Sequence, residues 1–221
     1  MAIRLRRFLI ALASALMALG VSLSVVLMPW FTEVAAPTSG ATELTGYSSE
    51  RVREVALEVR AFVTRTDASD LPAELDGLPA FGPSEVEHLT DVRRVVLAAR
   101  IATVIATFAL VVLAAESVAA GRLRDVSRGM RMGGRAILAI LAVSLFAGLA
   151  DFDSLFAAFH VVFFREGTWI FPAESLLIRL FPLRFWVVAG AAWGAFTVVA
   201  ALVLIVVGRA GASVARSARA E

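Results

Sequence analysis

Two histidines, His88 and His160, are the first candidates for chemistry in this sequence of 221 residues, because it contains no others. A neutral imidazole can accept a proton near pH 7. Glu85 and Asp91 lie three residues to either side of His88, so both reach the same face of a helix. Either carboxylate could fix the tautomer of His88 and orient its ring.

His160 lies in an apolar stretch, between Phe159 and Val161. Asp153 falls on the same helical face two turns away, roughly 10 Å of rise, so it is a third orienting candidate that would need a bend to pair directly. An ionisable group at membrane depth needs a partner or a cavity. Each histidine can therefore be either a reactive group or a satisfied structural residue.

Several other chemistries are excluded by composition. Cysteine is absent and all 21 basic residues are arginine, so thiol, Schiff-base and Ser-Lys catalysis have no nucleophile. Neither HExxH nor GxSxG occurs, and there is no glycine-rich phosphate loop. The histidines and acids have no compact ligand spacing, so we expect no metal and no cofactor. A net charge of +2 is too weak to indicate nucleic-acid binding.

Hydrophobic residues make up 59% of the sequence, which indicates an integral membrane protein. Four apolar stretches predict transmembrane helices at 8–28, 95–115, 136–150 and 185–207. The first is longer than the apolar part of a signal peptide, so we expect a retained anchor. The third has only 15 residues, so it must take a further turn from residues 132–135 or from beyond Asp151, and we expect it to continue outward to about residue 164.

Arginine placement orients these helices. Segments 1–7, 116–135 and 208–221 hold 11 Arg and three acidic residues, whereas segments 29–94 and 151–184 hold 9 Arg and 16 acidic residues. Positive charge on short loops marks the cytoplasmic side. We therefore expect both termini in the cytoplasm and both histidines at the outer face of the membrane.

The first outer segment, 29–94, is expected to form a helical cap. Apolar residues recur at helical spacing over 48–63, which predicts an amphipathic helix. Residues 66–81 are rich in Asp, Pro and Gly and predict an irregular loop. Ser84 with Glu87 resembles a capping box, so His88 would lie in the first turn of a helix that continues without a break to the end of the second crossing.

The second outer segment, 151–184, is apolar enough to form an interfacial or re-entrant loop. Its aromatic residues Trp169, Phe171 and Phe181, with Trp186, are typical of the lipid–water boundary. They can anchor the protein at that boundary or contact a substrate, and the pattern alone does not separate the two. The fold class expected is thus all-α, with four transmembrane helices, an extracytoplasmic helical cap and an interfacial loop.

Two motifs carry a family resemblance. ExxHLxDV occurs at 85–92, and LFxxFHxxFF at 155–164 is followed by WIFP at 169–172 and LLIRLFP at 176–182. Together they resemble the bacterial lipoprotein intramolecular transacylase (Lit) family. The resemblance implies transfer of the sn-2 acyl chain from the diacylglyceryl group of a lipoprotein to its own N-terminal cysteine amine. It also implies a diacylated lipoprotein, or a membrane lipid, as the partner in the bilayer.

The same resemblance assigns roles to residues. His160 and His88 would be the catalytic pair, one as base and the other as second acid/base or oxyanion donor, in either order. The residues that would contact the substrate are Phe163, Phe164, Trp169, Arg179 and Phe181. Leu183 stands where many relatives carry a glutamate after Phe-Pro, which removes one carboxylate.

Two other function classes remain open from the residues alone. A membrane scaffold or lipid-binding subunit would use the acidic outer segments for partners and would not need either histidine. A channel or transporter would need polar residues facing one another at mid-bilayer, and few are available.

Overall fold

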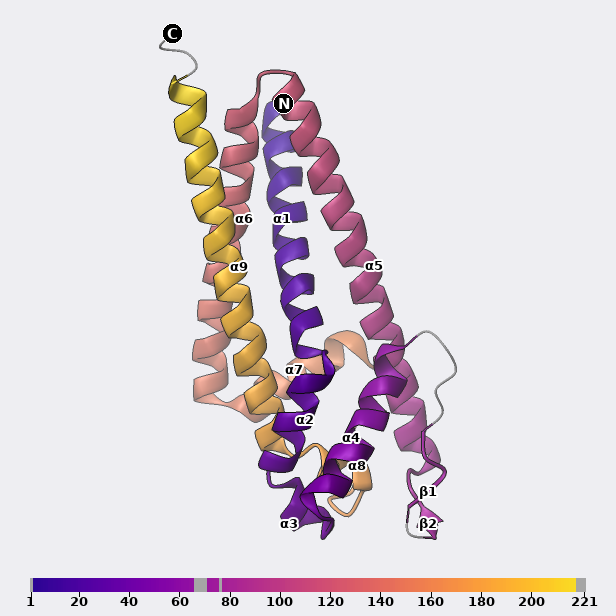
Figure 1. Ribbon diagram of the computed structural model, residues 1–221. Coiled ribbons are helices and arrows are strands. Elements are labelled where there is room, and N and C mark those ends of the chain that lie inside the picture. The colour runs from indigo at the N-terminus through magenta and orange to yellow at the C-terminus, as the bar shows by residue number, and fades with distance from the viewer. Residues whose placement is uncertain (1, 66–70, 76, 218–221) are drawn as a thin grey trace. The chain divides into compact units, whose positions relative to one another are not determined.

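The computed structural model describes residues 2–65, 71–75 and 77–217, and most of them are helical (Figure 1). The helices are α1 (Ala2–Val26), α2 (Pro29–Thr38), α3 (Ala41–Thr45), α4 (Ser49–Thr64), α5 (Pro83–Ala119), α6 (Leu123–Ala150), α7 (Phe152–Phe163), α8 (Leu176–Leu180) and α9 (Leu183–Ser217). Strands β1 (Glu74–Leu75) and β2 (Leu78–Pro79) form a short antiparallel pair. Helices α1, α5, α6 and α9 are long and apolar enough to cross a membrane, so the predicted fold class is confirmed.

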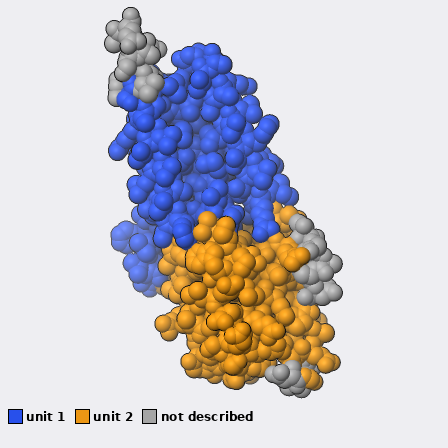
Figure 2. All heavy atoms as spheres, viewed as in Figure 1, with its two compact units in different colours: residues 1–24, 99–150, 193–221 blue, residues 25–98, 151–192 orange. Residues whose placement is uncertain are grey.

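The chain forms two compact units, coloured separately in Figure 2. Unit 1 comprises residues 1–24, 99–150 and 193–221, and unit 2 comprises residues 25–98 and 151–192. The long helices α5 and α9 each contribute residues to both units.

Unit 1 is a helix bundle in which small residues let the backbones approach closely. Its core contains Ile10 and Leu110, from α1 and α5, in one cluster with Val126 from α6. A Cβ placed on Gly133 of α6 would lie 2.5 Å from a backbone oxygen of α1, so only glycine fits there. Such contacts replace the hydrophobic effect as the main cause of helix association in lipid.

One end of unit 1 carries its ion pairs. Arg7 Nε lies 2.6 Å from the buried carboxylate of Asp125, and Arg6 Nη2 lies 3.0 Å from Glu116. The start of α1, the end of α9 and the α5–α6 turn all lie at this end (Figure 1). The ion pairs therefore connect two of the three arginine-rich segments on which the predicted orientation depends, 1–7 and 116–135.

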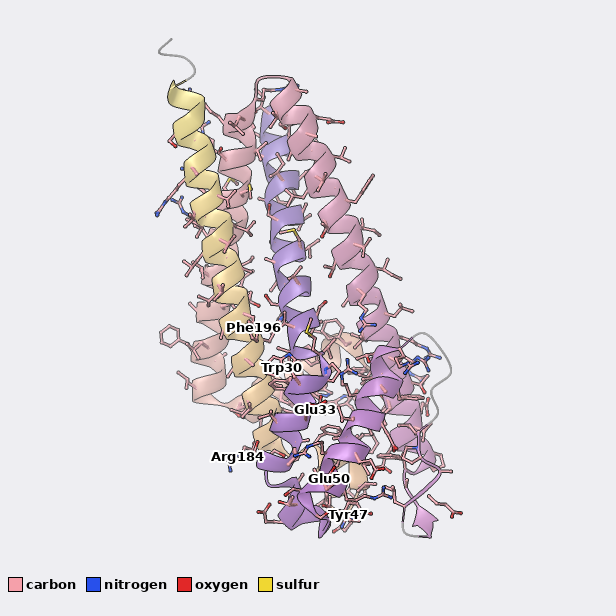
Figure 3. All side chains as sticks on the ribbon, in the orientation of Figure 1. Trp30, Glu33, Tyr47, Glu50, Arg184 and Phe196 are labelled. Atoms are coloured by element: carbon pink, nitrogen blue, oxygen red, sulfur yellow. The ribbon has the colours of Figure 1, made fainter. Side chains whose placement is uncertain are left out.

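In unit 2, α2 packs against α4 and α3 packs against α8. Helix α4 begins after Ser48, whose hydroxyl accepts a hydrogen bond from the Arg51 backbone N–H, and Tyr47 and Glu50 lie at this end (Figure 3). Its buried side chains recur at helical spacing, which confirms the predicted amphipathic helix: Val52, Val55, Ala56, Val59 and Phe62.

The third predicted crossing does not continue outward to residue 164, and that prediction was wrong. Asp151 adopts an extended conformation, with φ −160° and ψ 97°, and its carboxylate accepts a hydrogen bond from the Ser154 backbone N–H. This N-cap ends α6 and begins α7 as a separate helix. The extra length needed for a crossing comes instead from the other end of α6, which begins at Leu123.

The prediction that α5 would be one continuous helix is confirmed, but the predicted cap was wrong. Helix α5 begins at Pro83, so His88 lies in its second turn rather than its first. The Glu85 carboxylate accepts a hydrogen bond from the Gly82 backbone N–H at 2.6 Å, and Ser84 is not the cap. Proline favours the first helical position because its missing N–H needs no partner there.

The loop predicted at 66–81 was wrong in part, because β1 and β2 pair within it around Gly77, which has φ +80°. Residues 66–70 and 76 of that loop lie outside the described residues.

Candidate active site in unit 2

The two histidines meet in unit 2. The centroids of the His88 and His160 rings are 6.2 Å apart, with 23° between the ring planes. Each residue is only 8% exposed. They come from different helices, α5 and α7, and are separated by 72 positions along the chain. The two imidazoles therefore share one buried site, as expected from the sequence.

The ring of His160 is held in one orientation by its own helix. Its Nδ1 lies 2.7 Å from the Phe156 carbonyl oxygen, one turn earlier in α7. A carbonyl can only accept, so Nδ1 carries the proton and Nε2 carries the lone pair of the neutral ring. Burial lowers the pKa of His160, and the hydrogen bond to Phe156 opposes this in part. His160 is consequently kept neutral, with Nε2 able to act as a base.

Aromatic rings line both imidazoles. Phe164 lies 4.9 Å from His88 and 5.5 Å from His160, ring centroid to ring centroid. Trp169 lies 4.7 Å from His160, and Phe171 lies 5.5 Å from His88. Further contacts to His160 come from Phe156 at 4.1 Å and Phe159 at 5.6 Å. The two titratable groups are thus surrounded by aromatic side chains.

Glu85 does not orient His88 by a hydrogen bond, contrary to one of the predicted alternatives. The buried Glu85 carboxylate instead accepts hydrogen bonds from the Ser175 hydroxyl and from the Leu177 backbone N–H at 3.0 Å, besides the one from Gly82. It thus connects the start of α5, one turn before His88, to the start of α8.

The other two predicted orienting residues also make no hydrogen bond to an imidazole among the described residues. Asp91 pairs with Arg94 at 2.6 Å, within the same helix. Asp153 lies in the first turn of α7. The Phe156 carbonyl, and not the Asp153 carboxylate, makes the hydrogen bond that orients the His160 ring. A backbone acceptor four residues earlier is always available in a helix, and sequence reasoning that looked for carboxylates missed it.

The predicted substrate-contacting residues divide between the site and its surroundings. Phe164 and Trp169 contact the histidines. Phe163 does not: it is 48% exposed and packs on Phe159 at 4.8 Å. Phe181 is buried against Phe185, 5.0 Å away. Arg179 lies in α8, and its Nε is buried without a hydrogen-bond partner in the described structure.

Sequence reasoning left four residues off the predicted site that the structure brings to it: Phe156, Phe159, Phe171 and Ser175. Phe156 could have been found, because it lies one helical turn before His160. Phe171 was identified only as part of an interfacial aromatic group. Ser175 gave no signal, since its contact with Glu85 spans 90 positions.

No cluster of three or more His, Asp or Glu side chains with metal-binding geometry occurs among residues 2–65, 71–75 and 77–217.

Comparison with known proteins decides the family. Residues 8–186, most of the chain, match the family described as lipoprotein intramolecular transacylase Lit. The chain belongs to the Lit family. The predicted resemblance is therefore confirmed, and with it the prediction of a membrane transacylase rather than a scaffold. No curated protein sequence matches the chain.

Solved structures of Lit from Bacillus cereus share the fold. One in meso structure of that membrane integral transacylase is 15% identical, covers 98% of both chains and has a TM-score of 0.77. Two structures of its histidine variants, with arginine or alanine in place of a histidine, are 14% identical and have TM-scores of 0.78. They cover 98% of this chain and 95% and 96% of their own.

Proposed function

We propose that this Lit family member isomerises a diacylated bacterial lipoprotein. The α-amine of the lipidated N-terminal cysteine attacks the sn-2 ester carbonyl of its own diacylglyceryl group. A C–N bond forms, the C–O bond to glycerol breaks, and one proton passes from the amine to the released sn-2 oxygen. The product is a lyso-form lipoprotein of unchanged mass.

The observation that carries this proposal is the buried pair of imidazoles in a chain of this family. The transfer needs a base to take a proton from the attacking amine and an acid to return it to the leaving oxygen. Burial lowers the pKa of His88 to about 4 and also lowers the pKa of His160, so two neutral imidazoles lie 6.2 Å apart, ring centroid to ring centroid, and suit that exchange. No energy source is needed, because the amide product is more stable than the ester.

We assign the base to His160. Its Nδ1–H is engaged by the Phe156 carbonyl, so Nε2 is the free basic atom. His88 would then act as the second acid/base, since its Nδ1 is buried without a hydrogen-bond partner among the described residues. Phe164 and Trp169 would contact the substrate beside the rings, and Arg179 would meet its polar headgroup region.

The apolar surroundings favour transfer over hydrolysis. Aromatic rings on several sides of His160 leave little room for water, which would otherwise attack the same ester. Because amine and ester belong to one molecule, holding them in contact supplies much of the rate acceleration. The chain's own residues therefore need only position two groups and move one proton.

The proposed setting is the outer leaflet of the bacterial plasma membrane. In this arrangement residues 1–7, 116–135 and 208–221 are cytoplasmic, and 29–94 and 151–184 lie outside. The excess of arginine in the cytoplasmic segments and of acidic residues in the outer segments supports this orientation. The histidines then lie on the side to which lipoproteins are exported.

Expression in a bacterium that lacks this activity tests the proposal. Fragmentation mass spectrometry of a purified lipoprotein's N-terminal peptide should show the acyl chain moved from glycerol to the cysteine nitrogen. His88→Ala and His160→Ala should each abolish the change while the protein still accumulates in the membrane. An acylation pattern that is the same with and without the wild-type protein would refute the proposal.

A further inference from the structure

Trp169 differs from Trp186 and Trp193 in how its indole N–H is used. Trp186 Nε1 donates to the Phe181 carbonyl oxygen at 3.0 Å, and Trp193 Nε1 donates to the Leu19 carbonyl oxygen at 3.1 Å. Trp169 Nε1 is buried as well, yet it has no hydrogen-bond partner in the described structure. A buried donor without a partner costs about 1–3 kcal/mol, so such a group in a site needs an explanation.

The position of this unpartnered donor points to the reaction. The Trp169 ring lies 4.7 Å from the His160 ring, with 33° between the planes, so the indole packs against the proposed base. Trp169 follows a tight turn in which the Thr168 backbone N–H donates to the Arg165 carbonyl and Gly167 has φ +81°. The indole therefore follows directly on a hydrogen-bonded backbone turn.

An indole N–H can donate but cannot accept. Its missing partner must therefore be an acceptor, which excludes the substrate's ammonium group and favours an ester oxygen. We propose that Trp169 is a catalytic residue whose N–H donates to the sn-2 carbonyl oxygen as that oxygen gains negative charge. This inference rests on the proposed transacylation.

The donor would act in one defined step. When the amine nitrogen bonds to the carbonyl carbon, the electron pair of the C=O bond moves to oxygen, and the oxyanion accepts the Trp169 N–H. When the C–O bond to glycerol breaks, the pair returns and the hydrogen bond weakens. An interaction that is strongest in the transition state raises kcat more than it lowers KM.

Trp169→Phe tests this, because phenylalanine keeps an aromatic ring against His160 and removes the N–H donor, and the volume lost with the indole is matched in the control. The substrate is a synthetic diacylated lipopeptide with a free cysteine amine, in vesicles that contain the purified enzyme, and N-acyl product is quantified by fragmentation mass spectrometry. Trp186→Phe is the matched control, since it removes an indole donor that already has a backbone partner. Removing one oxyanion donor lowers kcat by about 10²–10³-fold in other acyl transfers.

We expect a fall in kcat of about 100-fold for Trp169→Phe with KM changed by less than about threefold, and a near wild-type kcat for Trp186→Phe. A wild-type kcat for Trp169→Phe, or an equal loss in both variants, would overturn the inference. Failure of the underlying transacylation would look different. In that case wild-type protein makes no N-acyl product, or the His88→Ala and His160→Ala variants make as much as wild type.

Discussion

Replacing Glu85 by alanine should weaken unit 2 more than any other single change of an acidic residue near the site. The carboxylate is 8% exposed and accepts three hydrogen bonds. Two of these come from Ser175 and Leu177, which are 90 and 92 positions away in the sequence. The substitution would therefore release the start of α8 from the turn of α5 that precedes His88.

The size of the effect follows from those contacts. A hydrogen bond to a charged acceptor contributes about 1.5–3 kcal/mol, so losing the two long-range bonds lowers the free energy of unfolding by about 3–6 kcal/mol. Glu85→Gln keeps the side-chain volume and the one oxygen, Oε1, that accepts both long-range bonds, so we expect a smaller loss than for alanine. The matched control is Glu87→Ala, whose exposed pair with Arg165 at 3.4 Å is worth about 0–1 kcal/mol.

The assay is denaturant or heat unfolding of the purified protein in detergent micelles, followed in parallel by transacylase activity. Stability and activity should fall in the order wild type, Glu85→Gln, Glu85→Ala, with Glu87→Ala close to wild type. Equal stability of Glu85→Ala and Glu87→Ala would refute the interpretation of the Glu85 contacts.

Three further outcomes are expected. Burial lowers the pKa of His160, and the base must be neutral to accept a proton. The transfer rate should therefore rise with pH through a midpoint below the usual pKa of 6.5. A midpoint at or above 6.5 in a profile of kcat against pH would contradict this. Gly133→Ala should lower the free energy of unfolding by about 1–3 kcal/mol, because the new Cβ would lie 2.5 Å from the Ala11 backbone oxygen. Gly190→Ala is the control and should not be destabilising, because nothing lies within 4 Å of its Cβ position. Asp125→Asn should destabilise unit 1 by about 3 kcal/mol by leaving Arg7 without its carboxylate, and an unchanged unfolding midpoint would contradict that.

Long-range periodic signals in the sequence predicted the fold well. The four apolar stretches and the amphipathic pattern of α4 each average over many residues, so one exception does not change them. Single-residue signals were less reliable. Asp151 caps a new helix, and no charge or proline in the preceding stretch announces the break. Helix α5 begins at Pro83, two residues earlier than a Ser84 cap predicts, and the Glu85 carboxylate accepts the N–H of Gly82 just before that start.

Sequence patterns predicted which side chains form the site but not which groups those side chains contact. The predicted topology placed the only two histidines on the same side of the membrane, and the family resemblance implied that they form a pair. The partners of His160 and Glu85 could not, since both are partly backbone groups, the Phe156 carbonyl and the Leu177 N–H. Every residue carries such groups, and sequence patterns do not distinguish which of them a fold brings within reach.

The most direct test of the central claim is a double-mutant cycle on the two histidines, with the rate of N-acyl product formation by purified enzyme as the readout. If His88 and His160 serve one proton-transfer unit, each alanine variant should lose nearly all activity and the double variant should be little slower than either single variant. If the two losses instead multiply, or if one variant transfers the acyl chain at the wild-type rate, the imidazole pair is not the catalytic centre.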